Sequence, residues 1–592
     1  MFHSHQFRKR SIYLQNQRKS EIIVILDFKN EFNSWLNYKK LDNKTLDELN
    51  EIKNDSSQIE DRFYKHLEFG TGGLRGVMGA GTNRMNIYTV RRVTQGIAKY
   101  LNSQKNKNSV VIAYDSRINS KEFAKEISRV LAGNDIFVYL FDKVKATPEL
   151  SFAVRYLKSD CGIMITASHN RPIYNGYKVY SDLGIQLSPI VANKVTKVIN
   201  SLDMFKDIKL ADISSNLIKE IGNEIDEEYY LKVLEQRINR NLIREHGKNL
   251  VIMYTPLHGV GFEAVNQVMF RSGFSNFHVV ESQKVPDGKF PTVDYPNPED
   301  KACFKLAIES AKEIDADLII ANDPDADRIG VAVKNKKNDY EFLTGNQVGI
   351  LLCNYIITQK KALKVMPNKS FVVSTIVTTR MVSEICRRHN IDYYDTYTGF
   401  KHICSKIDEL ELQKRNFIFG FEESYGYLVG TYARDKDGIV GSILISEMAL
   451  YYQQKNKNLI EILDELYNEY GFFMEDQLSI VREGVAGSGQ IQRIMSDLRN
   501  KDTDKFGNYE ISVIRDYLEQ KSQNVKTGEI SKIDMPADNV LYFEMSDKTE
   551  LAVRPSGTEP KIKFYLFTKS NCKEKSRENL SNLKDEINTN LS

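Results

Sequence analysis

The chain has 592 residues, and its 82 lysine and arginine residues nearly balance 79 aspartate and glutamate residues. A balance so even provides no uniform field that would indicate a nucleic-acid or membrane partner, although a local basic pocket stays open. No apolar run approaches the roughly 18 residues that cross a bilayer, and IIVIL at 22–26 is too short for a signal-peptide core. The sequence therefore predicts a soluble chain of roughly four domains at about 150 residues each.

Two features bear on where the protein works. The first 20 residues contain no acidic residue and five basic ones: Arg8, Lys9, Arg10, Arg18 and Lys19. They predict a flexible, solvated extension, with a targeting segment as the alternative. The six cysteines form no CxxC pair, which is typical of reduced thiols and indicates a cytoplasmic protein. They are Cys161, Cys303, Cys353, Cys386, Cys404 and Cys572.

In chain order, the first predicted elements are a strand at 110–115, a helix at 119–133 and a strand at 136–142. The same order returns between 250 and 282 and between 371 and 399. After each unit, one more apolar strand runs into a polar loop: CGIMI into TASHN, ADLII into ANDPDADR, and NFIF into GFEESYG. This alternation predicts three similar α/β domains with mixed, mainly parallel sheets and helices on both faces. Ligands bind beyond the carboxyl ends of such strands, where the three loops lie.

The last part of the chain has a different pattern. NVLYFEM, ELAVRPSGTEP and IKFYLFT predict short strands joined by turns, with helical segments around 510–520 and 574–590. This is a fourth, α+β domain with its own loop, RPSGT. We expect an extension at 1–31 and domains at 32–222, 223–338, 339–468 and 469–592.

The loop DPDADR places Asp323, Asp325 and Asp327 at alternate positions. Alternate residues of an extended segment project to the same side, so we expect the three carboxylates to converge. Converging carboxylates repel one another unless a cation neutralises them, and oxygen ligands suit Mg²⁺ or another hard divalent ion. A calcium loop would need glycine and glutamate where Arg328 and Lys334 stand. A solvated acidic turn is disfavoured because a buried strand leads into the loop.

Three further stretches are candidates for ligand binding. RPSGTEPK at 554–561 combines a guanidinium, two hydroxyls and a glycine, the parts of a phosphate cradle, and a tight turn is an equal alternative. FGTGGLRG at 69–76 surrounds Arg75 with glycines and predicts a second anion contact, or else a flexible turn. GFEESYG supplies Glu422 and Ser424, groups that can hold sugar hydroxyls, although paired glutamates usually lie on the surface.

Together these loops predict phosphoryl transfer to or from a phosphorylated polyol. Ser168 of TASHN would carry the phosphoryl group covalently, and the divalent ion would neutralise the charge of the phosphoserine. His169 either orients neighbouring groups or only holds the loop by a hydrogen bond.

TASHN, DPDADR, GFEES and RPSGTEPK, in this order, resemble the motifs of the α-D-phosphohexomutase superfamily, which comprises phosphoglucomutases and phosphomannomutases. NGYKVY, TPLHGVG, PDGKFPTVDYPNPE and TYTGFKHI are similar to the phosphoglucomutase-2 and phosphopentomutase-like branch. The resemblance runs from about residue 32 almost to the end. It implies four domains around a central cleft, with Mg²⁺ held by the three aspartates and a phosphoserine oxygen. A sugar 1-phosphate would be isomerised through a bisphosphorylated sugar, glucose 1,6-bisphosphate for a glucose substrate.

The resemblance also implies roles for single residues. The phosphate loop corresponds to Arg554, Ser556, Gly557 and Thr558, and the substrate site further includes Glu422, Ser424, Lys436 and Arg328. Arg75 and Lys178 match residues that contact the phosphoserine and assist proton transfer. The sequence departs from the family after Asn170, because it has Arg171 and Pro172 where relatives usually have proline and lysine. The change removes a different backbone amide and puts the local shape of the loop in question.

The implied activity is that of a phosphoglucomutase that also accepts pentose phosphates. A phosphomannomutase, a pentose-selective mutase and, from another class, a noncatalytic sugar-phosphate sensor are the alternatives. The implied partners are small sugar phosphates, and both a monomer and a dimer stay open. Domain IV, starting near 469, is expected to move as a lid that excludes water.

Overall fold

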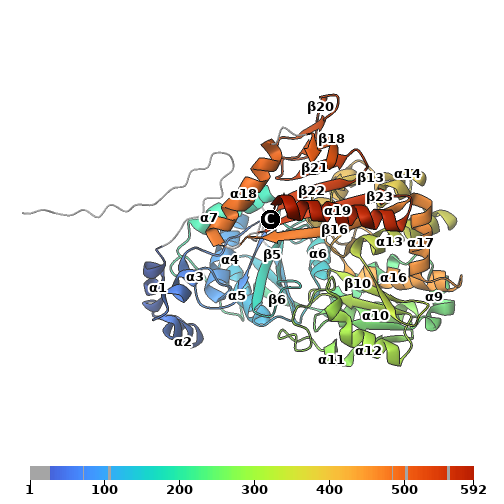
Figure 1. Ribbon diagram of the computed structural model, residues 1–592. Helices are drawn as coiled ribbons and strands as arrows, with labels where there is room; N and C mark the ends of the chain where they lie inside the picture. Colours follow the sequence, from blue (N-terminus) through green and yellow to red (C-terminus); the bar gives the residue numbers. More distant parts are fainter. Residues whose placement is uncertain are drawn as a thin grey trace, which may run out of the picture.

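The computed structural model describes residues 27–70, 72–104, 109–482, 484–500, 504–556 and 561–591. Four sheets follow one another along the chain, each with its own helices, and we call these units domains I to IV. In Figure 1, domain I lies at the left, domain II at the lower right, domain III at the right, and domain IV across the top. The predicted architecture of three α/β domains and a sheet-rich C-terminal domain is confirmed. Most of the predicted extension at 1–31 lies outside the described residues.

A helical module precedes the first sheet. It consists of α1 (Phe28–Leu36), α2 (Asn43–Ile52) and α3 (Ser56–Phe63). Each helix begins after an aspartate whose side chain accepts hydrogen bonds from amides of the first turn. Trp35 and Phe63 are buried and pack edge to face with each other. Trp35 also packs on Tyr88, which attaches the module to domain I.

Domain I is a mixed sheet with helices on both faces. Its elements are β1 (Gly73–Val77), α4 (Ile87–Ser103), β2 (Ser109–Tyr114), α5 (Ser120–Ala132), β3 (Phe137–Phe141), α6 (Thr147–Tyr156), β4 (Cys161–Ile165), β5 (Tyr174–Ser181), α7 (Pro189–Asn200) and β6 (Ile218–Ile221). The strand order is β1-β5-β4-β2-β3-β6, and only β1 and β5 are antiparallel to their neighbours. Alternate residues of β2 pack on opposite faces: Val110 and Ile112 with α4, α5 and α7, Val111 and Ala113 with α6.

Domains II and III repeat the same plan. Domain II has strands β7 (Ile252–Thr255), β8 (Phe277–Val279), β9 (Leu318–Asn322), β10 (Ile329–Lys334) and β11 (Tyr340–Leu343), with helices α8 (Asn223–Glu235), α9 (Arg240–His246), α10 (Gly261–Ser272), α11 (Glu281–Lys284) and α12 (Lys305–Glu313). Domain III has strands β12 (Ser370–Thr375), β13 (Asp392–Thr396), β14 (Asn416–Glu422) and β15 (Gly426–Leu428), with helices α13 (Gly345–Ala362), α14 (Met381–Arg388), α15 (Phe400–Leu412), α16 (Gly438–Gln453) and α17 (Leu459–Tyr470). In both sheets the parallel strands precede an antiparallel edge.

Domain IV is an antiparallel sheet. It contains β16 (Phe472–Val481), β17 (Lys505–Phe506), β18 (Tyr509–Asp516), β19 (Lys521–Asn524), β20 (Ile530–Lys532), β21 (Leu541–Met545), β22 (Glu550–Pro555) and β23 (Lys561–Ser570), with α18 (Gly484–Asn500) and α19 (Lys573–Leu591). The helix predicted at 574–590 is confirmed. The helix predicted around 510–520 is wrong, because β18 pairs there with β19 and β21. The β-branched residues Ile511, Val513 and Ile514 favour a pleated strand over a helix.

Domains I, II and III share one apolar core, which joins Leu150 of α6, Val265 of α10 and Ile443 of α16. Domain IV has a core of its own and meets domain III through a smaller cluster that includes Tyr397 and Tyr542, and through Phe473 of β16, which packs in the shared core. Among the residues that the structure describes, none of the helices combines the length and apolar character that crossing a membrane requires.

Candidate active site

The three loops singled out in the sequence occupy equivalent positions in the fold. Each joins a parallel strand to its antiparallel neighbour: 166–173 between β4 and β5, 323–328 between β9 and β10, and 423–425 between β14 and β15. The first two loops meet, because Ser168 Oγ donates a 2.7 Å hydrogen bond to Asp323 Oδ2 across 155 residues of chain. Both side chains are buried. The serine therefore lies against the acidic cluster.

The three aspartates form a compact, buried set of oxygen donors. Carboxylate oxygens of Asp323, Asp325 and Asp327 lie within 4.8 Å of one another, and the residues are at most 1% exposed. Asp325 Oδ1 and Asp327 Oδ1 are buried without a hydrogen-bond partner. Such oxygens are costly unless a cation satisfies them, so the residues fit a hard divalent ion.

The carboxylates converge for a different reason from the one expected. The loop is a turn and not an extended segment: Ala326 has a φ of 54° and donates its amide hydrogen to Asp323 O at 2.9 Å. Asp323 Oδ1 also accepts from the amides of Asp327 at 3.2 Å and Arg328 at 3.0 Å. The loop thus folds around the Asp323 side chain, which holds the three carboxylates together.

Two lysines compensate the negative charge. Lys178 Nζ of β5 lies 2.8 Å from Asp325 Oδ2 and 3.5 Å from Asp327 Oδ2. Lys436 Nζ lies 3.1 Å from Asp327 Oδ2 and 3.3 Å from Asp435 Oδ1. Burial alone would lower the pKa of each lysine, but these carboxylates raise it, so both ammonium groups stay charged at neutral pH.

The aspartates respond differently to this environment. Burial, reinforced by repulsion from Asp325 and Asp327, raises the pKa of Asp323 well above its ordinary value. Burial would also raise the pKa of Asp325, but Lys178 and hydrogen bonds from neighbouring groups lower it below the ordinary value. One of those bonds is donated by Thr147 Oγ1 at 2.7 Å. The cluster therefore combines a carboxylate whose ionised form is disfavoured, Asp323, with one whose ionised form is well compensated, Asp325.

Local contacts hold both the backbone and the side chain of Ser168. Its φ is 50°, its amide donates to Thr166 Oγ1 at 2.8 Å, and its Oγ lies 3.1 Å from His169 Nδ1. Burial and the charges of Arg328 and Arg75 lower the pKa of His169 well below 6.5, so the imidazole is neutral at pH 7.

Arg75 reaches this loop from a strand. It lies in β1, and its Nη1 donates to Asn170 Oδ1 at 3.2 Å. Gly73 is also part of β1, and a Cβ there would lie 2.3 Å from Tyr177 O. This glycine therefore permits close pairing of β1 with β5.

The sugar-recognition loop adjoins the metal loop. Glu422 ends β14 and is 5% exposed. Arg328 Nη1 donates to Ser424 O at 3.0 Å and lies 2.5 Å from Glu299 Oε1, so it bridges the two loops. A Cβ on Gly426 would lie 2.1 Å from Lys436 Cδ, which shows that the glycine lets the lysine pass into the site.

The phosphate loop lies at the boundary between domains III and IV. Arg554 Nη1 donates a hydrogen bond to Thr398 Oγ1 of domain III. Ser556 donates its amide hydrogen to Lys561 O at 2.8 Å, which closes the base of the loop. Gly557 and Thr558 lie outside the described residues.

Sequence reasoning does not identify several residues that support the site. Thr147 contacts Asp325, and Tyr180 OH donates to Asp435 Oδ2 at 2.7 Å, which fixes the carboxylate beside Lys436. Tyr180 stands two positions after Lys178 on β5 and therefore on the same face. That spacing in NGYKVY is the signal that could have identified it.

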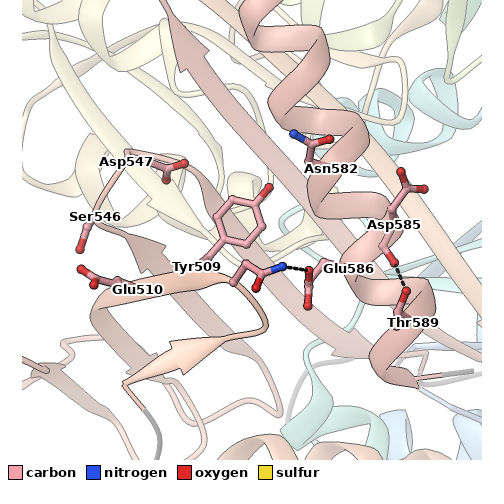
Figure 2. Close-up of a pocket in the computed structure, with 9 residues that line it drawn as sticks. Tyr509, Glu510, Ser546, Asp547, Asn582, Asp585, Glu586 and Thr589 are labelled. Atoms are coloured by element: carbon pink, nitrogen blue, oxygen red, sulfur yellow. Dashed lines mark hydrogen bonds between the residues drawn. The ribbon is translucent and has the colours of Figure 1, made fainter.

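A separate pocket of about 580 Å³ lies within domain IV (Figure 2). Its lining comes from β18, α19 and the turns beside them, and includes Glu510, Asp547, Asp585 and Glu586. None of the candidate site residues named above lines it.

Comparison with known proteins agrees with this geometry. Models of the phosphoglucomutase/phosphomannomutase family match residues 66–205 as alpha/beta/alpha domain I, 228–337 as domain II and 344–470 as domain III. A phosphoglucomutase of Staphylococcus aureus (strain MRSA252) is 38% identical over 518 residues, which are 87% of this chain and 92% of that protein. A phosphoglucomutase of Staphylococcus epidermidis (strain ATCC 12228) is 38% identical over 504 residues, 84% of this chain and 90% of the other.

Solved structures show the same fold at lower identity. The open form of parafusin, a phosphoglucomutase from Paramecium, has a TM-score of 0.66 at 16% identity and covers 89% of this chain and 95% of its own. A phosphoglucomutase/phosphomannomutase family protein from Burkholderia thailandensis has a TM-score of 0.62 at 17% identity, with coverages of 88% and 96%. With three family models matched in order and close relatives aligned over most of their length, the chain belongs to the phosphoglucomutase/phosphomannomutase family.

Proposed function

We propose that the chain is a phosphoglucomutase that interconverts glucose 1-phosphate and glucose 6-phosphate through a phosphorylated Ser168. The relatives at 37–38% identity are named phosphoglucomutases, which supports the substrate. The contact between Ser168 Oγ and Asp323 Oδ2 is the single observation that carries the mechanism, because it puts a nucleophilic hydroxyl against the proposed metal ligands. A chain that kept only the fold would not need this arrangement.

In the proposed cycle, a hydroxyl of the sugar monophosphate attacks the phosphorus of phosphorylated Ser168. The bond from phosphorus to Oγ breaks, Oγ regains a proton, and the sugar becomes glucose 1,6-bisphosphate. The bisphosphate turns around in the site and returns its other phosphoryl group to Ser168, which gives the isomer. Both steps transfer the same group between oxygens, so no oxidant or nucleotide is required.

Charged side chains around Ser168 have separate roles in this scheme. Lys178 stays protonated because Asp325 and Asp327 raise its pKa, so we assign it to stabilising charge on the transferring group and not to acting as a base. We assign Arg75 to the oxygens of the phosphoserine. Neutral His169, whose Nδ1 lies 3.1 Å from Oγ, orients the hydroxyl.

Asp323, Asp325 and Asp327, together with an oxygen of phosphorylated Ser168, would hold Mg²⁺. The bound ion supplies positive charge that neutralises the transferring phosphoryl group. The two unpartnered carboxylate oxygens support this assignment, since the lysines leave them unsatisfied.

Substrate recognition is assigned to the other two loops. Glu422 and Ser424 would hold sugar hydroxyls in either orientation of the bisphosphate, with Lys436 and Arg328 close by. The phosphate that does not react would be held by Arg554, Ser556, Gly557 and Thr558. The burial of Glu422 at the end of β14 and the passage of Lys436 over Gly426 support the first assignment.

A panel of sugar phosphates tests the proposal. Purified protein with Mg²⁺ and a trace of glucose 1,6-bisphosphate should convert glucose 1-phosphate to glucose 6-phosphate, with kcat/KM above those for mannose 1-phosphate and ribose 1-phosphate. A higher value for mannose or ribose would favour the phosphomannomutase or the phosphopentomutase instead. Inactivity on all three, with a bisphosphate still bound, would favour the noncatalytic sensor.

We place the protein in the cytoplasm, since all six cysteines are free and five are buried.

A further inference from the structure

The loop that presents Ser168 has a backbone conformation that needs support. Ser168 is a non-glycine residue with a φ of 50°, in the left-handed region that such residues rarely adopt. Pro172 lacks an amide hydrogen and cannot donate a stabilising hydrogen bond. Hydrogen bonds to the carbonyl groups of the loop can supply part of the support.

The guanidinium of Arg117 donates hydrogen bonds to four carbonyl groups of this loop. Arg117 Nη2 donates to Ser168 O and, at 2.5 Å, to Asn170 O. Its Nη1 donates at 3.0 Å to both Arg171 O and Tyr174 O. Arg117 is only 3% exposed, so these bonds form out of water, where an unsatisfied carbonyl is costly. The acceptors are backbone atoms, so these bonds do not depend on the side chains of Arg171 and Pro172.

Arg117 is itself fixed from two sides. Asp115, which is 1% exposed, accepts from the Arg117 amide at 2.9 Å, and its Oδ2 lies 3.5 Å from Nε. From domain II, the ring of Phe290 lies 5.0 Å from the guanidinium carbon. A Cβ on Gly288 would lie 2.5 Å from Ile118 N, so this domain II segment touches the backbone beside Arg117.

We infer that Arg117 is a positioning residue for the nucleophile: its guanidinium fixes the loop at 168–174 so that Ser168 Oγ faces Asp323. Through Phe290 it also links the shape of this loop to the docking of domain II. The inference rests on the proposed function for its effect on turnover, but the clamp itself does not. Arg117 bonds carbonyl groups and not reacting atoms, so it acts through Ser168. A lysine could keep the charge, but its three donors on one nitrogen cannot serve two pairs of carbonyls.

The test compares Arg117→Lys with Arg92→Lys. Arg92 is a matched control because it is also buried in domain I, at 5% exposure, and its Nε donates to Leu202 O at 3.2 Å. We expect Arg117→Lys to lower kcat about 100-fold, because a misplacement near 1 Å has that effect, with the KM for glucose 1-phosphate within about threefold. Hydrogen exchange of the amides at 168–174 should accelerate about tenfold or more, as local opening becomes easier. Arg92→Lys should change neither.

Unchanged exchange at 168–174 in Arg117→Lys would overturn the clamp, and so would a loosened loop with wild-type kcat. If Arg117→Lys does not fold, Phe290→Leu takes its place. It keeps the carbonyl bonds and removes the aromatic face, so exchange of the same amides should rise about fivefold. No rise would again overturn the inference. A wild-type protein inactive on every sugar phosphate would refute the proposed function, while the exchange measurement would still decide the clamp.

Discussion

The junction of domains I to III and the attachment of domain IV are built differently. The junction is buried and polar: Thr147 of domain I bonds Asp325 of domain II, and Tyr180 of domain I bonds Asp435 of domain III. Gly438 of domain III donates its amide hydrogen to Ala326 O of the metal loop at 3.1 Å. These contacts lie beside the apolar core that the three domains share.

Domain IV meets domain III through several contacts, and a cluster of polar ones surrounds Arg380. Arg380 Nη2 donates to Tyr542 OH at 2.8 Å, Nη1 lies 3.2 Å from Asp395 Oδ2, and Nε lies 3.3 Å from Glu550 Oε2. The chain enters domain IV through Gly471, which has a φ of 103° and separates α17 from β16. We interpret Ser168 and the aspartates as preorganised between packed domains, whereas the phosphate loop belongs to domain IV, whose movement as a lid stays a prediction.

The largest effect should follow from removing the nucleophilic hydroxyl at the junction of domains I to III. Ser168→Ala removes the phosphoryl carrier and should lower kcat more than about 10⁴-fold in a protein that still folds. Ser201→Ala is the control, since Ser201 is an exposed residue at the end of α7. Turnover of Ser168→Ala within tenfold of this control would exclude the covalent route.

The second-largest effect concerns Asp323 and Asp325, whose pKa values are shifted in opposite directions. In EDTA at pH 8, Asp325→Asn should destabilise the protein by about 3 kcal/mol, because it leaves Lys178 poorly compensated. Asp323→Asn should stabilise it by about 1 kcal/mol, because the native state raises the pKa of Asp323 and ionisation there costs stability at every pH above the unfolded value. Asp325, whose pKa is lowered, contributes stability that is present above its unfolded pKa and lost as pH falls.

Urea unfolding with and without Mg²⁺ checks this pair of variants. Added Mg²⁺ should stabilise the wild type and have little effect on either variant, since each removes a proposed ligand. Shifts of the same sign for both variants in EDTA would contradict the account of the cluster.

Weakening the attachment of domain IV should change KM and not kcat. Tyr542→Phe removes the hydroxyl that accepts from Arg380 and donates to Glu550. Loosening this interface by about 1 kcal/mol should raise the KM for glucose 1-phosphate about fivefold and leave kcat within about twofold. Tyr509→Phe, in the domain IV pocket, serves as the control. A fall in kcat at constant KM would show that domain IV belongs to the preorganised part.

The smallest effect is a pH dependence of phosphate binding. Burial, followed by the charge of Arg554, lowers the pKa of Lys401 to about 8. Lys401 lies in the first turn of α15, beside Thr398, which Arg554 contacts. Its ammonium is present below pH 8 and lost above, so the KM should rise about threefold between pH 7 and pH 9. Lys401→Met should have a raised KM that no longer changes over this range; a persistent change would assign the titration to another group.

Much of this architecture could be predicted from sequence because its signals are local. Apolar strands followed by polar loops predicted three equivalent α/β units, and the topology rule placed their loops on one side of each sheet. The contact between Ser168 and Asp323 spans 155 residues and follows only when the domains pack. The turn at Ala326 and the clamp by Arg117 depend on backbone groups that no side-chain pattern encodes. The incorrect helix at 510–520 shows the same limit, since pairing with β21 decided the conformation.

The central claim is that Ser168 carries phosphate beside the aspartate cluster, and mass analysis of tryptic peptides tests it most directly. Protein incubated with glucose 1,6-bisphosphate and Mg²⁺ should carry one phosphoryl group on Ser168, and excess glucose 1-phosphate should remove it as glucose 1,6-bisphosphate forms. A protein that turns over glucose 1-phosphate with Ser168 unmodified throughout, or with phosphate on another residue, would contradict the account.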